Sequence, residues 1–300
     1  MSESPDKTAL AFTGERFTPE CVREIWYEHW HRYAFASRLA TGKRVLDAAC
    51  GEGYGSAMLA GTADSVLGVD IDPVAIEHAR GRYGQQPNLS YVAADVTALD
   101  LPAASFDLIV SFETLEHVHE QERMIDGFAR VLKPDGLLII SSPDKATYSD
   151  AIGHQNPHHV RELYRNELEA LLKTHFPALR LLAQKLVFQS FLWDVDAQPS
   201  IALSHTADSS GRAEPGLNYP ALYYVALCAR RPSDLPQFAP ALWTFGDAAE
   251  SVYAHYNQEI RKIIAAGHQI IEQDAEIQRL RQALAEANAR AATPSEQESK

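Results

Sequence analysis

The sequence predicts an α/β protein built on a mostly parallel sheet with helices on both faces. Short apolar segments that end in acidic or small residues alternate along the first half with segments of helical character. Buried strands that alternate with helices are typical of parallel sheets. The chain has 300 residues, 46% of them hydrophobic. That length accommodates one such domain of roughly 200–250 residues and a modest appendage.

The first half supplies five of the expected strands, with right-handed crossovers between them. A helix rich in aromatic residues and histidine, expected over 22–39, precedes them. Further helices are expected over 55–59 and 73–82, and another helical segment follows the fourth strand. The five strands are expected at 44–47, 65–70, 89–95, 106–111 and 136–141.

The second half is less regular. A helix is expected over 165–175, and β-rich segments over 179–193 and 221–229. Between the two β-rich segments, residues 194–218 are polar and contain Pro, Gly and Ser. A loop of this length is either an element that covers the substrate or a disordered segment, and the sequence favours neither.

The C-terminal part predicts a coiled coil. Residues 232–247 are expected to form a linker, 248–292 a long helix and 293–300 a disordered tail. A seven-residue repeat with charged flanks predicts a homo-oligomer, a dimer or trimer, although a helix folded back on its own domain is the alternative. The repeat consists of Tyr256, Ile263, Ile270, Ile277, Leu284 and Ala291, with Ala266, Gln273, Leu280 and Ala287 three positions later.

Composition excludes several classes of protein. With 27 basic against 40 acidic residues, the net charge of −13 argues against binding nucleic acid through bulk charge. Three cysteines cannot form a disulfide framework. No apolar run is long enough to span a membrane, and the N-terminus lacks a secretory pattern, so a cytoplasmic protein is expected.

A glycine loop and three acids predict a nucleotide-like ligand. Gly51 and Gly53 follow the first strand, where they let the backbone approach a ligand at the carboxyl edge of the sheet. Asp47 precedes this loop, and Asp70 and Asp95 end the next two strands. This set suits an adenosine ligand that carries a cation. The dinucleotide and P-loop glycine patterns are both missing.

These segments resemble a known family. VLDAACGEGYG, GVDIDP, AADV, FDLIVSFETLEHV and LKPDGLLIISSP are similar, in order and spacing, to the motifs of class I S-adenosylmethionine-dependent methyltransferases, over about residues 43–143. The resemblance implies a Rossmann-like sheet of seven strands whose last, antiparallel strand is expected within 221–229. The methyltransferase domain is then expected over 43–231, with residues 1–42 as a helical segment that covers the cofactor and substrate.

The resemblance also implies how S-adenosylmethionine is bound. The loop residues Ala49, Gly51 and Gly53 are expected to approach the methionyl part, and Asp47 the ammonium or sulfonium end. Asp70 would bind the ribose hydroxyls, and Ile71 would pack on adenine. Asp95 and Val96 would read the adenine edge, and Phe112 would lie at the methionyl end. Arg32 is expected either to pair with the cofactor's carboxylate or to have a structural role.

Two pairs of segments outside these motifs narrow the resemblance to one group of methyltransferases. TGERFTP with HWHRY precedes the sheet, and NPHHVRE with residues 168–176 follows the fifth strand. Together they resemble bacterial methyltransferases associated with lipopolysaccharide and other surface glycans. The implied reaction is O-methylation of a hydroxyl on a sugar or glycan terminus. Alternatives are a diffusible small-molecule acceptor, an RNA 3′ end, or a coiled-coil scaffold with a vestigial pocket.

The segment after the fourth strand carries the candidate catalytic groups. Glu113, Glu116 and His117 are spaced so that a helix would present them on one face, which predicts a Mg²⁺ or Mn²⁺ site. A similar ExxEH binds metal in ubiquinone-pathway and small-RNA methyltransferases, and in the RNA enzymes a later histidine, matched here by His159, completes the set. Without a metal, His117 or His159 is the expected general base. His158 is not separable from His159 by sequence, and Glu113 could instead hold the cofactor's amino group.

Overall fold

The chain forms two compact units, Met1–Phe245 and Gly246–Lys300. The computed structural model describes residues 18, 24–153, 155–187, 189, 205–207, 212–238 and 242–291.

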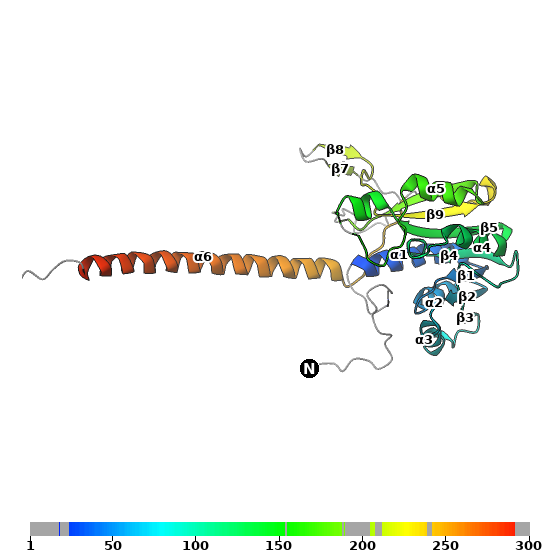
Figure 1. Ribbon diagram of the computed structural model, residues 1–300, viewed down its shortest axis with the longest axis horizontal. Helices are drawn as coiled ribbons and strands as arrows, with labels where there is room; N and C mark the ends of the chain where they lie inside the picture. Colours follow the sequence, from blue (N-terminus) through cyan, green and yellow to red (C-terminus); the bar gives the residue numbers. More distant parts are fainter. Residues whose placement is uncertain are drawn as a thin grey trace, which may run out of the picture. The chain divides into compact units, whose positions relative to one another are not determined.

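The first unit contains a seven-stranded sheet in the order β3-β2-β1-β4-β5-β9-β6 (Figure 1). All neighbouring strands from β3 to β5 are parallel, whereas β9 pairs antiparallel with both β5 and β6. The predicted α/β class and the antiparallel last strand are thereby confirmed. The strands are β1 (Arg44–Ala48), β2 (Ser65–Asp70), β3 (Leu89–Ala93), β4 (Phe106–Ser111), β5 (Leu132–Pro143), β6 (Ala178–Gln184) and β9 (Tyr223–Ala229).

Helices cover both faces of this sheet. Successive strand residues point to opposite faces, so Val45 and Leu46 of β1 lie in two different apolar clusters. The cluster with Val45 contains side chains of α1 (Glu24–Ala40), α2 (Tyr54–Ala60) and α3 (Pro73–Tyr83). The cluster with Leu46 contains side chains of α4 (Gln121–Val131) and α5 (Arg165–Lys173).

The start of α3 illustrates how local sequence sets an element. Asp72 has an extended backbone, and its Oδ1 accepts a hydrogen bond from the Val74 N–H at 2.8 Å. Pro73 occupies the first helical position, where its missing N–H costs no helical hydrogen bond. The helix therefore begins at Pro73, three residues after the last residue of β2.

Two segments depart from the predicted elements. β5 begins at Leu132, four residues before the predicted strand, because Leu132 pairs with Phe106 of β4 across a register shift. Within the predicted polar loop, β7 (His205–Ala207) and β8 (Ala213–Pro215) form an antiparallel pair. Residues 194–204 and 208–211 of this loop lie outside the described residues.

The segment predicted as a linker contains a short turn, η3 (Pro232–Asp234), and aromatic residues that pack on α1. Trp243 and Phe238 contact Phe35 with ring centroids 5.1 and 5.7 Å apart. Phe245 stacks on His31 and contacts Trp26. These contacts therefore help to fix the position of α1 within the first unit.

The second unit consists mainly of α6 (Ser251–Ala291), one continuous helix (Figure 1). The heptad residues between Tyr256 and Ala287 are exposed, including Ile263 at 70% and Ile270 at 57%. A long C-terminal helix is thus present, while the coiled coil remains a prediction. Among the described helices, none combines the length and apolar character needed to cross a membrane.

Candidate active site at the carboxyl edge of the sheet

Most of the predicted site residues lie at the carboxyl ends of strands or in the segments that follow them, at one edge of the sheet. β1, β2, β4 and β5 are parallel, so the segments that follow them meet there. β9 runs in the opposite direction, and its first residue, Tyr223, is paired with Pro143 at the end of β5 and with Gln184 at the end of β6. Tyr223 and Gln184 therefore join the same edge.

The glycine loop after β1 is held in a compact turn with three left-handed residues. Ala49, Gly51 and Gly53 have φ values of 63°, 56° and 94°. A Cβ on Gly53 would lie 2.7 Å from the Ala79 Cβ and 2.8 Å from the Tyr91 hydroxyl oxygen. Gly53 is thus required by packing and backbone conformation, independently of any ligand.

Asp70 is oriented by the backbone around it. Its Oδ2 accepts from the Gly51 N–H at 2.8 Å, and its Oδ1 accepts from the Asp72 N–H at 2.9 Å. Each carboxylate oxygen keeps a further acceptor position. The next residue, Ile71, leaves 71% of its surface exposed at the end of β2. This exposed apolar side chain beside an oriented carboxylate is the arrangement that a nucleoside would cover.

Asp47 lies beneath the loop and is fully buried. Its oxygens accept hydrogen bonds from the Ser56 hydroxyl at 2.6 Å and the Tyr33 hydroxyl at 3.1 Å. Burial raises the pKa of Asp47 to about 7, although both hydroxyls favour the ionised form. A carboxyl group whose charge is poorly compensated therefore lies under the site.

The residues expected at the adenine and methionyl ends differ in exposure. Asp95 is exposed two residues beyond β3, and its Oδ1 accepts hydrogen bonds from the N–H and hydroxyl of Thr97. Val96 is buried in the core on the α4 side, so only its backbone could face a ligand. Phe112 is buried after β4 and makes an edge contact with Tyr33 at 5.0 Å.

Arg32 of α1 is buried at the same edge with unused hydrogen-bonding capacity. It is 2% exposed, and its Nε donates to Gln184 Oε1 at 2.6 Å. Its guanidinium lies over the Tyr223 ring at 4.6 Å, and its Nη1 is 3.4 Å from Glu113 Oε1. Within the described residues, neither terminal nitrogen makes a hydrogen bond. Two buried terminal NH2 groups are thus available to donate to an acidic ligand group.

Glu28 is a second buried acid next to this arginine. Burial raises its pKa to about 7, against the opposing effects of Arg32 and of a hydrogen bond with Tyr223. The backbone carbonyl of Glu28 accepts from Gln184 Nε2 at 3.0 Å. Gln184 therefore ties α1 to the sheet through two hydrogen bonds, one to Glu28 and one to Arg32.

Glu116, His117 and His159 come together as a group of possible ligands. One ligand atom from each lies within 4.8 Å of the others, and the two imidazole rings meet edge to face with centroids 4.9 Å apart. Glu116 is 1% exposed, and its Oε2 has no hydrogen-bond partner within the described residues. Burial, reinforced by Glu113, holds the pKa of Glu116 well above its usual range. Such a carboxylate needs either a proton or a cation.

Hydrogen bonds orient both imidazoles of this group. His117 Nδ1 lies 3.1 Å from the His158 carbonyl oxygen, which can only accept, so Nδ1 carries the proton. His159 Nδ1 lies 2.5 Å from Glu162 Oε1 and donates to that carboxylate. In both rings Nε2 is then the nitrogen without a proton, the form that a metal ligand or a general base requires. The Nε2 of His159 accepts a hydrogen bond from Asn156 Nδ2 at 3.0 Å.

The expectation that Glu113, Glu116 and His117 share one helical face is wrong. Glu113 precedes the short turn η1 (Leu115–His117) and has a left-handed φ of 48°. Its Oε1 accepts from the Ser141 hydroxyl at 2.6 Å and faces Arg32. The described group of possible ligands does not include Glu113. The strained backbone therefore turns this carboxylate towards α1 and away from the two histidines.

The structure also distinguishes between histidines that the sequence left equivalent. His158 is exposed and contributes its backbone carbonyl, whereas the His159 side chain enters the ligand group. His119 is exposed, and His154 lies outside the described residues.

Several residues at this edge were not among the predicted site residues. Tyr33 and Ser56 bind Asp47, Gln184 and Tyr223 contact Arg32, and Tyr148 stacks on His159 with ring centroids 5.3 Å apart. Tyr33 ends the HWHRY segment, whereas the other four belong to no motif with fixed spacing. The repeated aromatic residues of α1 were the available signal for Tyr33.

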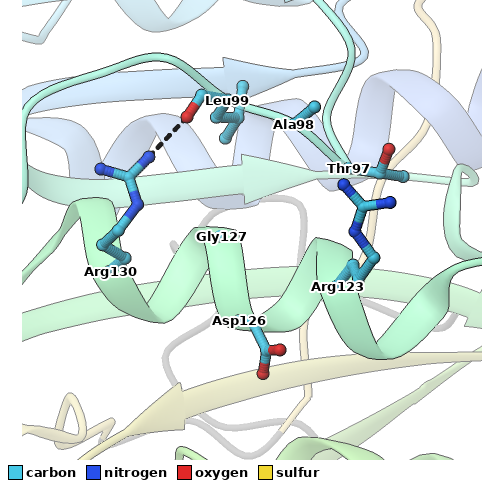
Figure 2. Close-up of a pocket in the computed structure, with 7 residues that line it drawn as sticks. All are labelled: Thr97, Ala98, Leu99, Arg123, Asp126, Gly127 and Arg130. Carbon is cyan, nitrogen blue, oxygen red and sulfur yellow. Dashed lines mark hydrogen bonds between the residues drawn. The ribbon is translucent and has the colours of Figure 1, made fainter.

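A surface pocket elsewhere is lined by other residues. Figure 2 shows it between Thr97–Leu99 of the loop after β3 and the side chains of α4, with Arg130 donating to the Leu99 carbonyl. Arg123 and Asp126 project from the same helix. None of the predicted site residues lines it.

Comparisons with known proteins agree with the predicted enzyme class. Residues 46–140 match the family described as a methyltransferase domain. The chain is 40% identical over 167 residues to a probable S-adenosylmethionine-dependent methyltransferase of Mycobacterium tuberculosis, covering 54% of this chain and 60% of that protein. A similarly described protein of Mycolicibacterium smegmatis is 37% identical over 171 residues, covering 56% and 65%.

Two further similarities are more limited. The ubiquinone biosynthesis O-methyltransferase of Coxiella burnetii is 40% identical over 102 residues, 34% of this chain and 44% of that protein. Among solved structures, the YcgJ protein of Bacillus subtilis aligns with a TM-score of 0.48 and 18% identity, over 68% of this chain and 100% of that one. The alignments with the curated relatives named here thus span less than two thirds of each relative's length.

Proposed function

We propose that the chain is an S-adenosylmethionine-dependent O-methyltransferase whose acceptor is a hydroxyl on a sugar or glycan terminus. The arrangement of the glycine loop against Asp70, within the residues that match a methyltransferase domain, carries the first part of this proposal. The names of the curated relatives support the same enzyme class.

The nucleoside end of the cofactor would bind along the ends of β2 and β3. Asp70 would accept from the ribose hydroxyls through its remaining acceptor positions. Ile71 would pack on adenine, which would remove an exposed apolar side chain from water. Asp95 would accept from the adenine amino group, with the Val96 backbone beside it.

The methionyl end would bind between the glycine loop and α1. The two terminal NH2 groups of Arg32, which make no hydrogen bond within the described residues, suit the cofactor's carboxylate. Glu113 lies beside them and would face the ammonium group, with Asp47 as a buried negative charge below. The cofactor supplies a methyl group already activated on sulfur. The chain's task is to orient the acceptor oxygen and remove its proton.

A divalent metal fits the group formed by Glu116, His117 and His159. The supporting observations are the buried Oε2 of Glu116, which has no hydrogen-bond partner within the described residues, and the two imidazoles whose Nδ1 atoms donate and whose Nε2 atoms therefore carry no proton. A metal would take the place of Asn156 Nδ2 as the partner of His159 Nε2. Without Glu113 the set has one carboxylate and two imidazoles, which suits Mn²⁺ better than Mg²⁺. A metal held there would lower the pKa of an acceptor hydroxyl.

If no metal is used, His159 is the best candidate for the general base. Partial burial lowers its pKa despite the hydrogen bond with Glu162, so it is neutral near pH 7. Its Nε2 lies 3.0 Å from Asn156 Nδ2, which marks that nitrogen as an acceptor. His117 is the second candidate.

The sugar acceptor is argued from the resemblance of the outer segments and from the ability of a metal to bind a vicinal diol. The relative named as a ubiquinone biosynthesis O-methyltransferase supports oxygen as the methylated atom. Small-molecule and RNA acceptors are therefore included as alternatives in the test.

Calorimetric titration with S-adenosylmethionine, followed by a screen of acceptors with methyl-labelled cofactor, tests the function. We expect saturable binding and label transfer to a sugar diol. Label transfer only to a phenolic compound or only to an RNA 3′ end would show that this compound, and not a sugar, is the acceptor. If no cofactor binding occurs, the enzyme proposal fails and a scaffold role remains.

Chelation tests the metal separately. We expect excess EDTA to abolish transfer, Mn²⁺ to restore it, and Glu116→Ala to reproduce the loss. Glu120→Ala, which removes an exposed acid nearby, is the control and should retain activity. Full activity in excess EDTA would exclude metal assistance.

We also infer that the chain is a dimer or trimer through α6. The exposed heptad residues support this, since burial of such a stripe against a second copy is favourable.

A further inference from the structure

The proposed metal ligands come from two segments that are far apart in the sequence. Glu116 and His117 belong to η1, whereas His159 lies some forty residues further along, in the segment 156–162. The position of His159 relative to the other two ligands therefore depends on how these segments are joined.

Backbone hydrogen bonds form the first part of this junction. The Glu116 carbonyl accepts from the Val160 N–H at 2.8 Å and from the Arg161 N–H at 3.1 Å. The His117 imidazole donates to the His158 carbonyl at 3.1 Å. The residues that make these bonds, His158 before His159 and Val160 and Arg161 after it, are its neighbours in the sequence.

Gln121, the first residue of α4, forms the second part. Its side-chain Nε2 donates to the Leu115 carbonyl of η1 and to the Arg161 carbonyl, both at 2.8 Å. Gln121 is fully buried, and its Oε1 has no partner within the described residues. A buried amide with an unpaired oxygen is costly, so its presence is best explained by the two bonds that its nitrogen makes.

We propose that Gln121 is a positioning residue that holds His159 against Glu116 and His117. It makes no hydrogen bond to any of the three ligand side chains and acts through the carbonyl of Arg161, two residues after His159. This inference rests on the proposed function, because it concerns the preformed geometry of the proposed metal site. An amide of this length is required, since glutamate offers no donor and asparagine is too short to reach both carbonyls.

The test compares Gln121→Met with the wild-type chain, using Mn²⁺ and S-adenosylmethionine as separate probes. We expect Mn²⁺ affinity, followed by the paramagnetic resonance of free Mn²⁺, to fall at least tenfold, as is common when a supporting residue of a metal site is lost. The affinity for S-adenosylmethionine should stay within twofold, because the glycine loop lies on the other side of β4. A purely structural role would weaken both.

Two other variants complete the series. Gln121→Asn keeps a buried amide that is too short to reach both carbonyls, and we expect it to lose part of the Mn²⁺ affinity. Gln85→Met removes an exposed glutamine and should change neither affinity. Unchanged Mn²⁺ binding in both Gln121 variants would overturn the inference.

Hydrogen exchange distinguishes failure of this inference from failure of the metal proposal. If the wild-type chain binds no Mn²⁺, the metal proposal fails, and the positioning role is judged from the amides of Val160 and Arg161. Faster exchange of these amides in Gln121→Met, with unchanged exchange in β1, supports positioning. Equal exchange in the variant and the wild type contradicts it.

Discussion

At the residue scale, the site is distinguished by buried acids with raised pKa values. The side chains of Asp47 and Glu28 are 0% and 7% exposed, and this burial raises the pKa of each carboxyl group to about 7. The hydroxyl groups around Asp47 and the guanidinium beside Glu28 offset only part of that effect. Both acids therefore change charge near neutral pH, and a cationic ligand would shift them towards the ionised form.

Cofactor affinity should accordingly rise with pH through the titration of Asp47. The ionised fraction of a group with a pKa of about 7 increases about tenfold between pH 6 and pH 8. We expect the dissociation constant for S-adenosylmethionine to fall by up to that factor, with proton release visible by calorimetry in buffers of different ionisation enthalpy. Asp47→Asn should bind more weakly and show a flatter profile. Asp64→Asn, at an exposed acid, should behave like the wild type.

Glu28 should make the fold less stable as pH rises. Its pKa is about 7 in the folded chain, against 4.5 for an ordinary glutamate, so the folded state binds more protons between these values. The free energy of unfolding therefore falls across this interval as pH increases. Glu28→Gln should remove about 1–3 kcal/mol of that dependence. Urea unfolding at pH 5 and pH 8 measures it, and an equally steep dependence in the variant would contradict the assignment.

At the scale of elements, the packing of α1 on α2 prepares the site. The Tyr33 ring of α1 lies over Gly55 of α2, where an added Cβ would come within 2.0 Å of it. The same tyrosine donates to Asp47. Close packing of two helices thus sets the position of a hydroxyl in the site.

Gly55→Ala should therefore destabilise the chain and weaken cofactor binding together. We expect a loss of about 1–3 kcal/mol, because the Tyr33 ring must move. Gly81→Ala in α3 is the matched control, since no atom lies within 4 Å of an added Cβ there. That variant should gain about 0.5–1 kcal/mol from helix propensity. Thermal unfolding and cofactor titration of both variants test the comparison.

The elements also show why prediction succeeded in some places and failed in others. The strand at 106–111 was predicted from an apolar run alone, because a strand buried on both faces needs little else. The turn after it was predicted as helical, but the strained backbone at Glu113 depends on Ser141 and Arg32, which belong to other elements. Spacing along the chain contains no information about such contacts.

At the scale of the whole molecule, the chain divides into a sheet-containing unit and a long helix. The exposed heptad residues of that helix make self-association the principal expectation. Loss of the association should leave the cofactor site unchanged, because its residues all belong to the first unit.

Ile263→Asp combined with Ile270→Asp should convert the proposed dimer or trimer into a monomer of 33.2 kDa. Charges at two successive core positions of a heptad repeat oppose helix association. Light scattering coupled to size exclusion measures the mass. Ala275→Asp, outside the repeat, should leave it unchanged. A wild-type chain that is already monomeric would contradict the oligomer.

The sequence by itself determined the order of the strands and helices along the chain, the glycine loop and the acids at the strand ends. These features are local, since apolar runs, glycines and turn residues express their preferences within a few positions. Only the tertiary structure decided which side chains meet at the carboxyl edge. It separated Glu113 from Glu116, distinguished His159 from His158, and placed Gln121 between the two segments that bear the histidines. Those contacts join residues distant in sequence, and they depend on packing and on buried hydrogen bonds.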